Sequence, residues 1–136
     1  MILADSSAWI EFLRATGSDA HLRLRGLVER QAELATTEVV LMEVLAGARS
    51  DGELEDLRRL LYGRCMLLPL DGPADYERAA ELYRQCRSSG ETIRKLTDCL
   101  IAVVAIRAGI ELLHRDGDFD AIARHTSLRV LGKPPG

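Results

Sequence analysis

The sequence predicts an α/β protein in which a mostly parallel sheet of four or five strands is covered on both faces by helices. First, short apolar runs alternate with longer segments of helical periodicity along the chain, as in repeated βα units. Second, 47% of the residues are hydrophobic but only 4% are aromatic, which indicates an aliphatic core. Third, a length of 136 residues suits one compact domain.

Each predicted strand is a short apolar run that ends at a polar or turn-forming residue. The strands are predicted at residues 1–4, 33–36, 65–70 and 111–114, with 128–131 as a candidate fifth strand. Ser6 or Ser7 can cap the helix that follows the first strand. The inner side of this helix is predicted to carry Trp9, Ile10 and Leu13.

The other helices are predicted from amphipathic or wholly apolar patterns. They lie at residues 21–30, 38–48, 53–61, 74–87, 97–108 and 120–124. Segment 97–108 is apolar on all sides, so we expect a helix that is buried on most sides and ended by Gly109. The whole pattern predicts a single domain over residues 1–132, followed by a short tail at 133–136.

Composition narrows the class of protein. The net charge of −3 argues against a protein held to nucleic acid by bulk charge, but it is compatible with an enzyme that carries local cations. The three cysteines include no CxxC pair, so neither a disulfide framework nor a zinc site is expected. No signal peptide and no apolar run of roughly 20 residues is present, which predicts a soluble cytoplasmic protein.

Acidic residues recur near the predicted carboxyl ends of the strands, where open parallel sheets bind ligands. They are Asp5, Glu43, Asp98, Asp116 and Asp118. Each alone has a structural explanation, as a turn former, a helix N-terminal acid or a partly buried salt-bridge partner. Together, however, these carboxylates would repel one another unless a cation neutralised them. Oxygen ligands suit Mg²⁺ or Mn²⁺, which would activate a water molecule toward a phosphate and stabilise the leaving oxygen.

Four segments, in this order and at this length, resemble a PIN-domain ribonuclease, and more narrowly the toxin of a VapBC toxin–antitoxin pair. These segments are "ILADSSAWIEF", "TEVVLMEVLAGAR", "LTDCLIAVVAIRAG" and "LLHRDGDFDAIA". The first contains Asp5, and in the second Glu43 stands four residues before Gly47. In the third, Asp98 opens the buried helix, and the fourth resembles the acidic loop of the family. The resemblance extends over nearly the whole chain.

This resemblance implies a three-layer α/β/α sandwich and a metal-dependent endoribonuclease that uses Mg²⁺ or Mn²⁺. Asp5, Glu43, Asp98 and Asp116 match the catalytic acidic quartet of the family, and Asp118 matches a further acid of some members. The implied metal ligands are therefore Asp5, Asp98, Asp116 and Asp118. The resemblance also implies a homodimer and a small VapB-like antitoxin that blocks the site within a hetero-oligomer. The RNA substrate would be a tRNA, a ribosomal RNA or a message.

Two hydroxyl residues are candidates for supporting roles. Ser7 matches a hydroxyl residue that often follows the first acid of the family by two positions. It either holds Asp5 or a metal-bound water, or it caps the helix. Thr97 has the same two interpretations. His114 stands where family members often have Thr, so we expect a structural role for it rather than a catalytic one.

The net negative charge requires local cations for any contact with RNA phosphates. Arg94 and Lys95 lie just before Asp98, and Arg115 lies beside the acidic loop. These three residues are the candidate RNA contacts. Their alternative role is that of ordinary solvated loop charges.

Other functional classes fit less well. A phosphotransfer receiver-like domain needs a lysine near its last strand, but the only late lysine is Lys133, in the predicted tail. A phosphatase with an Asp nucleophile would place a second acid at position 7, where this chain has Ser7. A non-catalytic α/β binding module stays an alternative.

Overall fold

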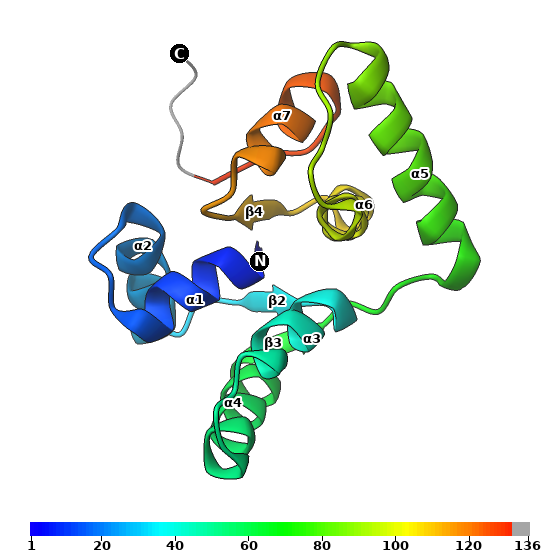
Figure 1. Cartoon of the computed structure of the whole chain (residues 1–136). Helices are drawn as coiled ribbons and strands as arrows, with labels where there is room; N and C mark the ends of the chain where they lie inside the picture. Colours follow the sequence, from blue (N-terminus) through cyan, green and yellow to red (C-terminus); the bar gives the residue numbers. More distant parts are fainter. Residues whose placement is uncertain (132–136) are drawn as a thin grey trace.

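The computed structural model describes residues 1–131 and contains a parallel sheet of four strands in the order β3-β2-β1-β4 (Figure 1). The strands are β1 (Ile2–Ala4), β2 (Leu34–Thr36), β3 (Cys65–Leu67) and β4 (Glu111–Leu113). This architecture confirms the predicted α/β class with its parallel sheet. The tail predicted at 133–136 lies outside the described residues.

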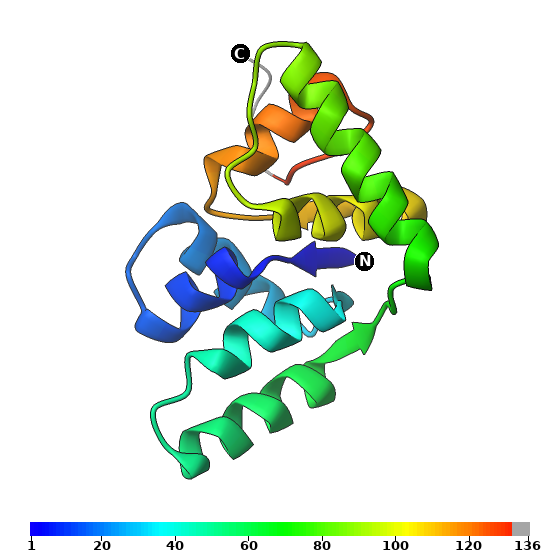
Figure 2. The same ribbon diagram turned by 45° about the vertical axis from the view of Figure 1, so that its right-hand side comes forward.

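The helices between the strands form two groups. They are α1 (Ser6–Arg14), α2 (Asp19–Glu29), α3 (Glu38–Ala46), α4 (Asp51–Arg64), α5 (Gly72–Ser88), α6 (Leu96–Ala108) and α7 (Gly117–His125). Helix α1 packs on α2 and α3, whereas α5, α6 and α7 pack on one another. Figure 2 shows β1, the dark blue arrow at the N-terminus, between α6 and α3 of these two groups. Within residues 1–131, no helix combines the length and the apolar character that a membrane span requires.

The pairing of β1 with β4 brings two distant segments of the chain together. Leu3 lies opposite Leu112 and Ala4 lies opposite Leu113 in this parallel pair. The backbone N–H of Asp5 donates a hydrogen bond to the carbonyl oxygen of Leu113, at 2.9 Å. The residues that follow β1 and β4 therefore leave the sheet side by side.

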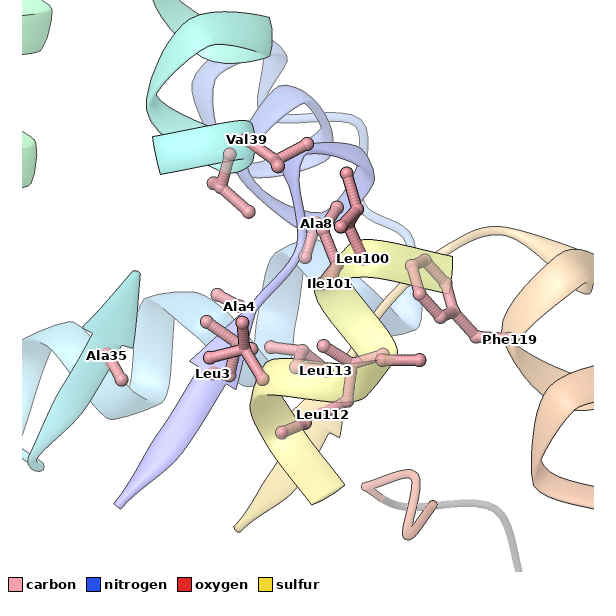
Figure 3. Packing of buried hydrophobic residues seen from close by; sticks show 14 of the residues in the cluster. Leu3, Ala4, Ala8, Ala35, Val39, Leu100, Ile101, Leu112, Leu113 and Phe119 are labelled. Atoms are coloured by element: carbon pink, nitrogen blue, oxygen red, sulfur yellow. The ribbon is translucent and has the colours of Figure 1, made fainter. Parts of the chain in front are cut away.

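Buried aliphatic side chains join the sheet to the helices that cover it. Leu3, Leu112 and Leu113 are at most 2% exposed. Figure 3 shows them in one cluster with Leu100 and Ile101 of α6. A Leu-to-Ala change in such a core typically costs about 2 to 5 kcal/mol, so this cluster holds the strand ends firmly in place.

Helix α6 is buried along most of its length, as its apolar sequence predicts. Every residue from 98 to 105 is buried, and Gly109 ends the helix with a φ of 68°. This left-handed conformation suits glycine, which has no Cβ atom. Because Asp98 lies in the first turn of α6, the helix carries its carboxylate into the protein interior.

Two predictions for α1 are wrong. Its N-cap is Asp5, whose side chain accepts a hydrogen bond from the backbone N–H of Ser7, rather than Ser6 or Ser7 itself. Trp9 is fully buried as predicted, but Ile10 and Leu13 are 36% and 43% exposed. They line a groove between α1, α3 and α4 instead of packing into the core.

The C-terminal elements also differ from the prediction. Helix α7 begins at Gly117 rather than at residue 120, because the Asp116 side chain caps it by accepting from the backbone N–H of Asp118. Segment 128–131 forms only an isolated parallel bridge between Leu112 and Val130, not a fifth strand. The acidic loop is thus a helix N-terminus, which places Asp118 in a helical turn.

Candidate metal centre

Four separate segments bring acidic side chains to the carboxyl edge of the sheet. Asp5 follows β1, Asp116 follows β4, Glu43 lies on α3 and Asp98 begins α6. Burial raises the pKa of Glu43, and the negative charge of Asp5 raises it further. The charge of Asp5 also contributes, after burial, to the raised pKa of Asp98. The predicted quartet is therefore electrostatically connected.

Three of the acids form a compact group. One carboxylate oxygen from each of Asp98, Asp116 and Asp118 lies within 4.8 Å of the other two. Asp98 is only 1% exposed, and neither of its carboxylate oxygens has a hydrogen-bond partner among the described residues. Burying such a group without partners is costly, whereas an all-oxygen set suits a hard divalent cation. These residues therefore fit a Mg²⁺ or Mn²⁺ site.

Two carboxyl groups of the compact group, Asp98 and Asp116, are shifted in opposite directions in their pKa. Burial, followed by the hydrogen bond that protonated Asp98 can make to Asp118, raises the pKa of Asp98 to about 8. Burial also opposes ionisation of Asp116, but the backbone N–H of Asp118 and then Lys95 and Arg94 outweigh it and lower its pKa. One carboxyl group thus resists ionisation beside one that favours it, as expected for carboxyl groups that lie close together.

Asp118 is held by the loop that precedes α6. It accepts hydrogen bonds from the backbone N–H groups of Arg94 and Lys95, at 3.3 and 3.2 Å. Its own backbone N–H donates to Asp116 at 3.0 Å. Asp118 therefore fastens the start of α6 to the start of α7, and fixes the distance between Asp98 and Asp116.

Ser7 positions Asp5. One carboxylate oxygen of Asp5 accepts from the backbone N–H of Ser7 at 2.9 Å and from its hydroxyl at 2.5 Å. The Ser7 hydroxyl accepts in turn from the backbone N–H of Arg115 at 2.9 Å. The other Asp5 oxygen is buried and has no hydrogen-bond partner within residues 1–131. Burial raises the pKa of Asp5, and the contacts with Ser7 oppose this.

Glu43 lies outside the compact group and is hydrogen-bonded to α1. The hydroxyl of Ser6 donates to a Glu43 carboxylate oxygen at 3.1 Å. The side chain is half-buried, as its apolar neighbours in the sequence predict. Ser6 was missed as a site residue, although its position directly after Asp5 in the first turn of a helix was the available signal.

Two of the three predicted RNA contacts are paired with the acids. Lys95 Nζ lies 3.2 Å from Asp116 Oδ2 and 3.8 Å from Asp98 Oδ1. Arg94 lies 3.0 Å from Asp116 through Nη2 and 3.3 Å from Asp118 through Nε. The sequence predicted these two residues as contacts for RNA phosphates, whereas in the structure they are paired with every member of the compact group.

The remaining predicted residues lie beside the group. Arg115 Nε is 3.3 Å from Glu11 Oε1, so its charge is paired away from the compact group. Thr97 lies within the first turn of α6, where Lys95 holds the N-cap position, so the capping interpretation of Thr97 is wrong. His114 Nδ1 accepts from the backbone N–H of Asp116 at 3.1 Å, which fits the expected structural role.

Comparison with known proteins identifies relatives over almost the whole chain. The PIN domain family matches residues 2–125. The chain is 48% identical over 131 residues to VapC ribonuclease Mb1587 of Mycobacterium bovis, covering 96% of this chain and 97% of the relative. It is equally similar to ribonuclease VapC11 of Mycobacterium tuberculosis. Ribonuclease VapC51 of the same organism is 32% identical over 115 residues, with 82% and 78% of the two chains covered.

Solved structures share the fold at lower identity. VapBC2 of Rickettsia felis, bound to a promoter DNA fragment, superposes with a TM-score of 0.72 at 17% identity and covers 96% of this chain and 97% of the other. VapC20 of Mycobacterium tuberculosis, a toxin that cleaves the sarcin-ricin loop, gives 0.69 at 20% identity and covers 95% and 99%. At these identities the likeness supports the fold alone.

Proposed function

The chain belongs to the PIN domain family, and from that premise we propose that it is a Mg²⁺- or Mn²⁺-dependent endoribonuclease that acts as the toxin of a type II toxin–antitoxin pair. The observation that carries the proposal is the compact group of Asp98, Asp116 and Asp118, in which the buried Asp98 carboxylate lacks a hydrogen-bond partner among the described residues. The names of the relatives, which are ribonucleases of the VapC type, support the same activity.

Asp98, Asp116 and Asp118 would hold the metal ion together with Asp5, whose charge acts on Asp98. A divalent cation at this place supplies an activated water and stabilises negative charge on the phosphodiester. Ser7 keeps Asp5 in position, because its hydroxyl and backbone N–H both bind the same carboxylate oxygen. Thr97 keeps its proposed supporting role at the start of α6.

Glu43 is the proposed proton-transfer group. Burial and the charge of Asp5 both raise its pKa, which moves a glutamate toward the range useful for general acid–base catalysis. The Ser6 hydroxyl orients one carboxylate oxygen and leaves the other to exchange a proton with water. Glu43 also borders the groove that Ile10 and Leu13 line, so solvent has access to it.

RNA would approach over the cations beside the acids. Arg94 and Arg115 are 72% and 59% exposed in their side chains, and Lys95 is 46% exposed. We propose that these three residues contact phosphates that flank the cleaved bond. A structured RNA such as tRNA or ribosomal RNA is the proposed substrate class, with a message as the alternative.

A VapB-like antitoxin is the proposed partner. The groove of about 290 Å³ between α1, α3 and α4 exposes Ile10 and Leu13 and reaches Glu43, so an apolar segment seated there would lie beside the acids. We also propose a homodimer, a toxin–antitoxin hetero-oligomer and a cytoplasmic location. These assignments can be tested by co-purification with the product of a neighbouring reading frame.

The direct test is RNA cleavage by the purified protein. We expect cleavage with Mg²⁺ or Mn²⁺ and none after treatment with EDTA. Asp98→Asn should abolish cleavage while circular dichroism shows a folded domain. Asp56→Asn is the matched control, because this aspartate of α4 is 78% exposed in its side chain and remote from the compact group.

Full activity of Asp98→Asn, or cleavage that persists in EDTA, would contradict the proposal. A folded protein that binds RNA without cleaving it would favour the non-catalytic binding module. Sequencing the RNA ends that appear after induced expression would identify the substrate and distinguish tRNA, ribosomal RNA and message.

A further inference from the structure

Lys95 lies beside two carboxyl groups of the compact group, those of Asp98 and Asp116. Its Nζ atom is 3.2 Å from Asp116 Oδ2 and 3.8 Å from Asp98 Oδ1. Both distances are those of ion pairs, and the pair with Asp116 is the closer one. Lys95 therefore satisfies Asp116 but leaves both oxygens of Asp98 without a hydrogen-bond partner in the described chain.

The backbone of Lys95 is fixed, whereas its side chain can move. The backbone N–H groups of Arg94 and Lys95 both bind Asp118, which anchors the loop whatever the two side chains do. The Lys95 side chain is 46% exposed and has no capping hydrogen bond at the N-terminus of α6. Rotation of its four-carbon stem can thus take the ammonium into solvent without disturbing the loop.

The charge balance favours replacement of the Lys95 ammonium by a divalent cation. Lys95 brings one positive charge to two carboxylates, and part of that charge is hydrated because the side chain is half exposed. A divalent ion brings twice the charge and can bind oxygens of both Asp98 and Asp116 directly, whereas the ammonium is close to Asp116 alone. Both cations need the same two side chains, so they compete.

We propose that Lys95 is a displaceable counter-cation that is paired with Asp98 and Asp116 before metal binds, leaves them when metal binds, and thereby sets the metal affinity of the site. The inference rests on the proposed metal-dependent function, because it assumes that this group binds a divalent ion. It adds a role for Lys95 that precedes RNA binding. Once displaced, the ammonium lies at the exposed rim, where it is available to an RNA phosphate.

The first test measures Mn²⁺ binding to the full chain without RNA, by the electron paramagnetic resonance signal of free Mn²⁺. Lys95→Met removes two half-exposed ion pairs, so it should tighten Mn²⁺ binding by about twofold to thirtyfold. Arg115→Met is the matched control, because it removes one positive charge beside Asp116 that is paired with Glu11. We expect the control to change the affinity by less than about twofold.

The second test follows Lys95 in the unaltered protein. The chain has only two lysines, Lys95 and Lys133, so acetylation of each can be resolved by mass spectrometry. We expect added Mn²⁺ to increase the labelling rate of Lys95 severalfold relative to Lys133. This measurement keeps the inference testable if Lys95→Met fails to fold.

The outcomes separate the inference from the proposed function. If the unaltered protein binds Mn²⁺ and Lys95→Met binds it no more tightly, or more weakly, Lys95 only positions Asp116 and the inference is wrong. Equal tightening in Lys95→Met and Arg115→Met would reduce the effect to net charge and would also overturn it. If neither the unaltered protein nor Lys95→Met binds Mn²⁺, the proposed metal site itself is wrong.

Discussion

Replacing Asp98 with Asn should make the metal-free protein more stable while it abolishes RNA cleavage. Asp98 is 1% exposed, and its pKa rises from an ordinary 3.8 to about 8. At pH 7, this difference in pKa lowers the free energy of unfolding by about 4 kcal/mol, compared with a neutral residue at the same position. Because the asparagine amide can also donate to Asp118 and the site can relax, we expect a gain of about 2 to 4 kcal/mol.

The sign of the pH dependence follows from the number of protons that the folded and the unfolded state each bind. Between pH 4 and pH 8 the folded state holds a proton on Asp98 that the unfolded state has released, so stability falls as pH rises. Asn cannot titrate, and the advantage of the variant should therefore vanish near pH 4 and grow toward pH 8. Urea unfolding in EDTA at several pH values measures this, and at pH 7 the melting temperature should rise by about 5 to 15 °C.

Asp56→Asn, an exposed change of the same chemistry, should alter stability by less than about 0.5 kcal/mol at any of these pH values. Added Mg²⁺ should stabilise the unaltered protein and leave Asp98→Asn unchanged, because binding to the folded state alone raises stability. If Asp98→Asn destabilises the metal-free protein, or if its effect is independent of pH, Asp98 is a structural residue and our account of its burial is wrong.

Two further substitutions test whether Ser7 holds Asp5 in position and whether the buried ion pair of Asp75 is independent of the compact group. Ser7→Ala removes the 2.5 Å hydrogen bond to Asp5, so we expect the pKa of Asp5 to rise further. Cleavage should fall about tenfold while unfolding free energy changes by about 1 kcal/mol, as shown by pH–rate profiles and urea unfolding. Asp75→Asn replaces a buried carboxylate that accepts hydrogen bonds from Arg107 at 2.7 Å and from Arg78 at 2.9 Å. Burial opposes its ionisation, but these contacts prevail and lower the pKa of Asp75, so its stabilisation is present above about pH 4 and is lost as pH falls further. The variant should therefore lose about 2 kcal/mol at pH 7 and less at pH 3, with unchanged Mn²⁺ affinity. A change in Mn²⁺ affinity would show that this ion pair and the compact group are coupled.

Periodicity predicted most of the fold because each strand and helix carries its own local signal. The run from Leu96 to Ala108 is apolar on every side, and it forms the buried helix expected from it. The same reasoning failed for Ile10 and Leu13, since apolar spacing cannot distinguish a face that packs into the core from one that lines a groove. Groove and core use the same residue types, and only the neighbouring helices decide between them.

The alternation of strands and helices predicted where the acids would gather but not how they pair. Asp5 and Asp116 lie close together because β1 and β4 are neighbours in a parallel sheet, which the βα alternation suggests. The contact of Arg94 with Asp116 spans 22 positions and depends on the course of the loop before α6. No local pattern in the sequence encodes that course, so the pairing of these cations with the acids was not predicted.

Two features of the site, the burial of Asp98 and its distant pairing with Lys95, lower stability and are explained by a need for a cation. A carboxylate in the first turn of an otherwise apolar helix, without a hydrogen-bond partner in the described chain, costs folding free energy. Lys95 offsets only part of this cost, because it reaches Asp98 at 3.8 Å and lies half in solvent. A site designed for stability alone would have a neutral residue at position 98 or a cation in closer contact with it. Stabilisation by Asp98→Asn together with tighter Mn²⁺ binding by Lys95→Met would show that both imperfections serve metal binding, whereas either result alone would leave the other residue with a purely structural role.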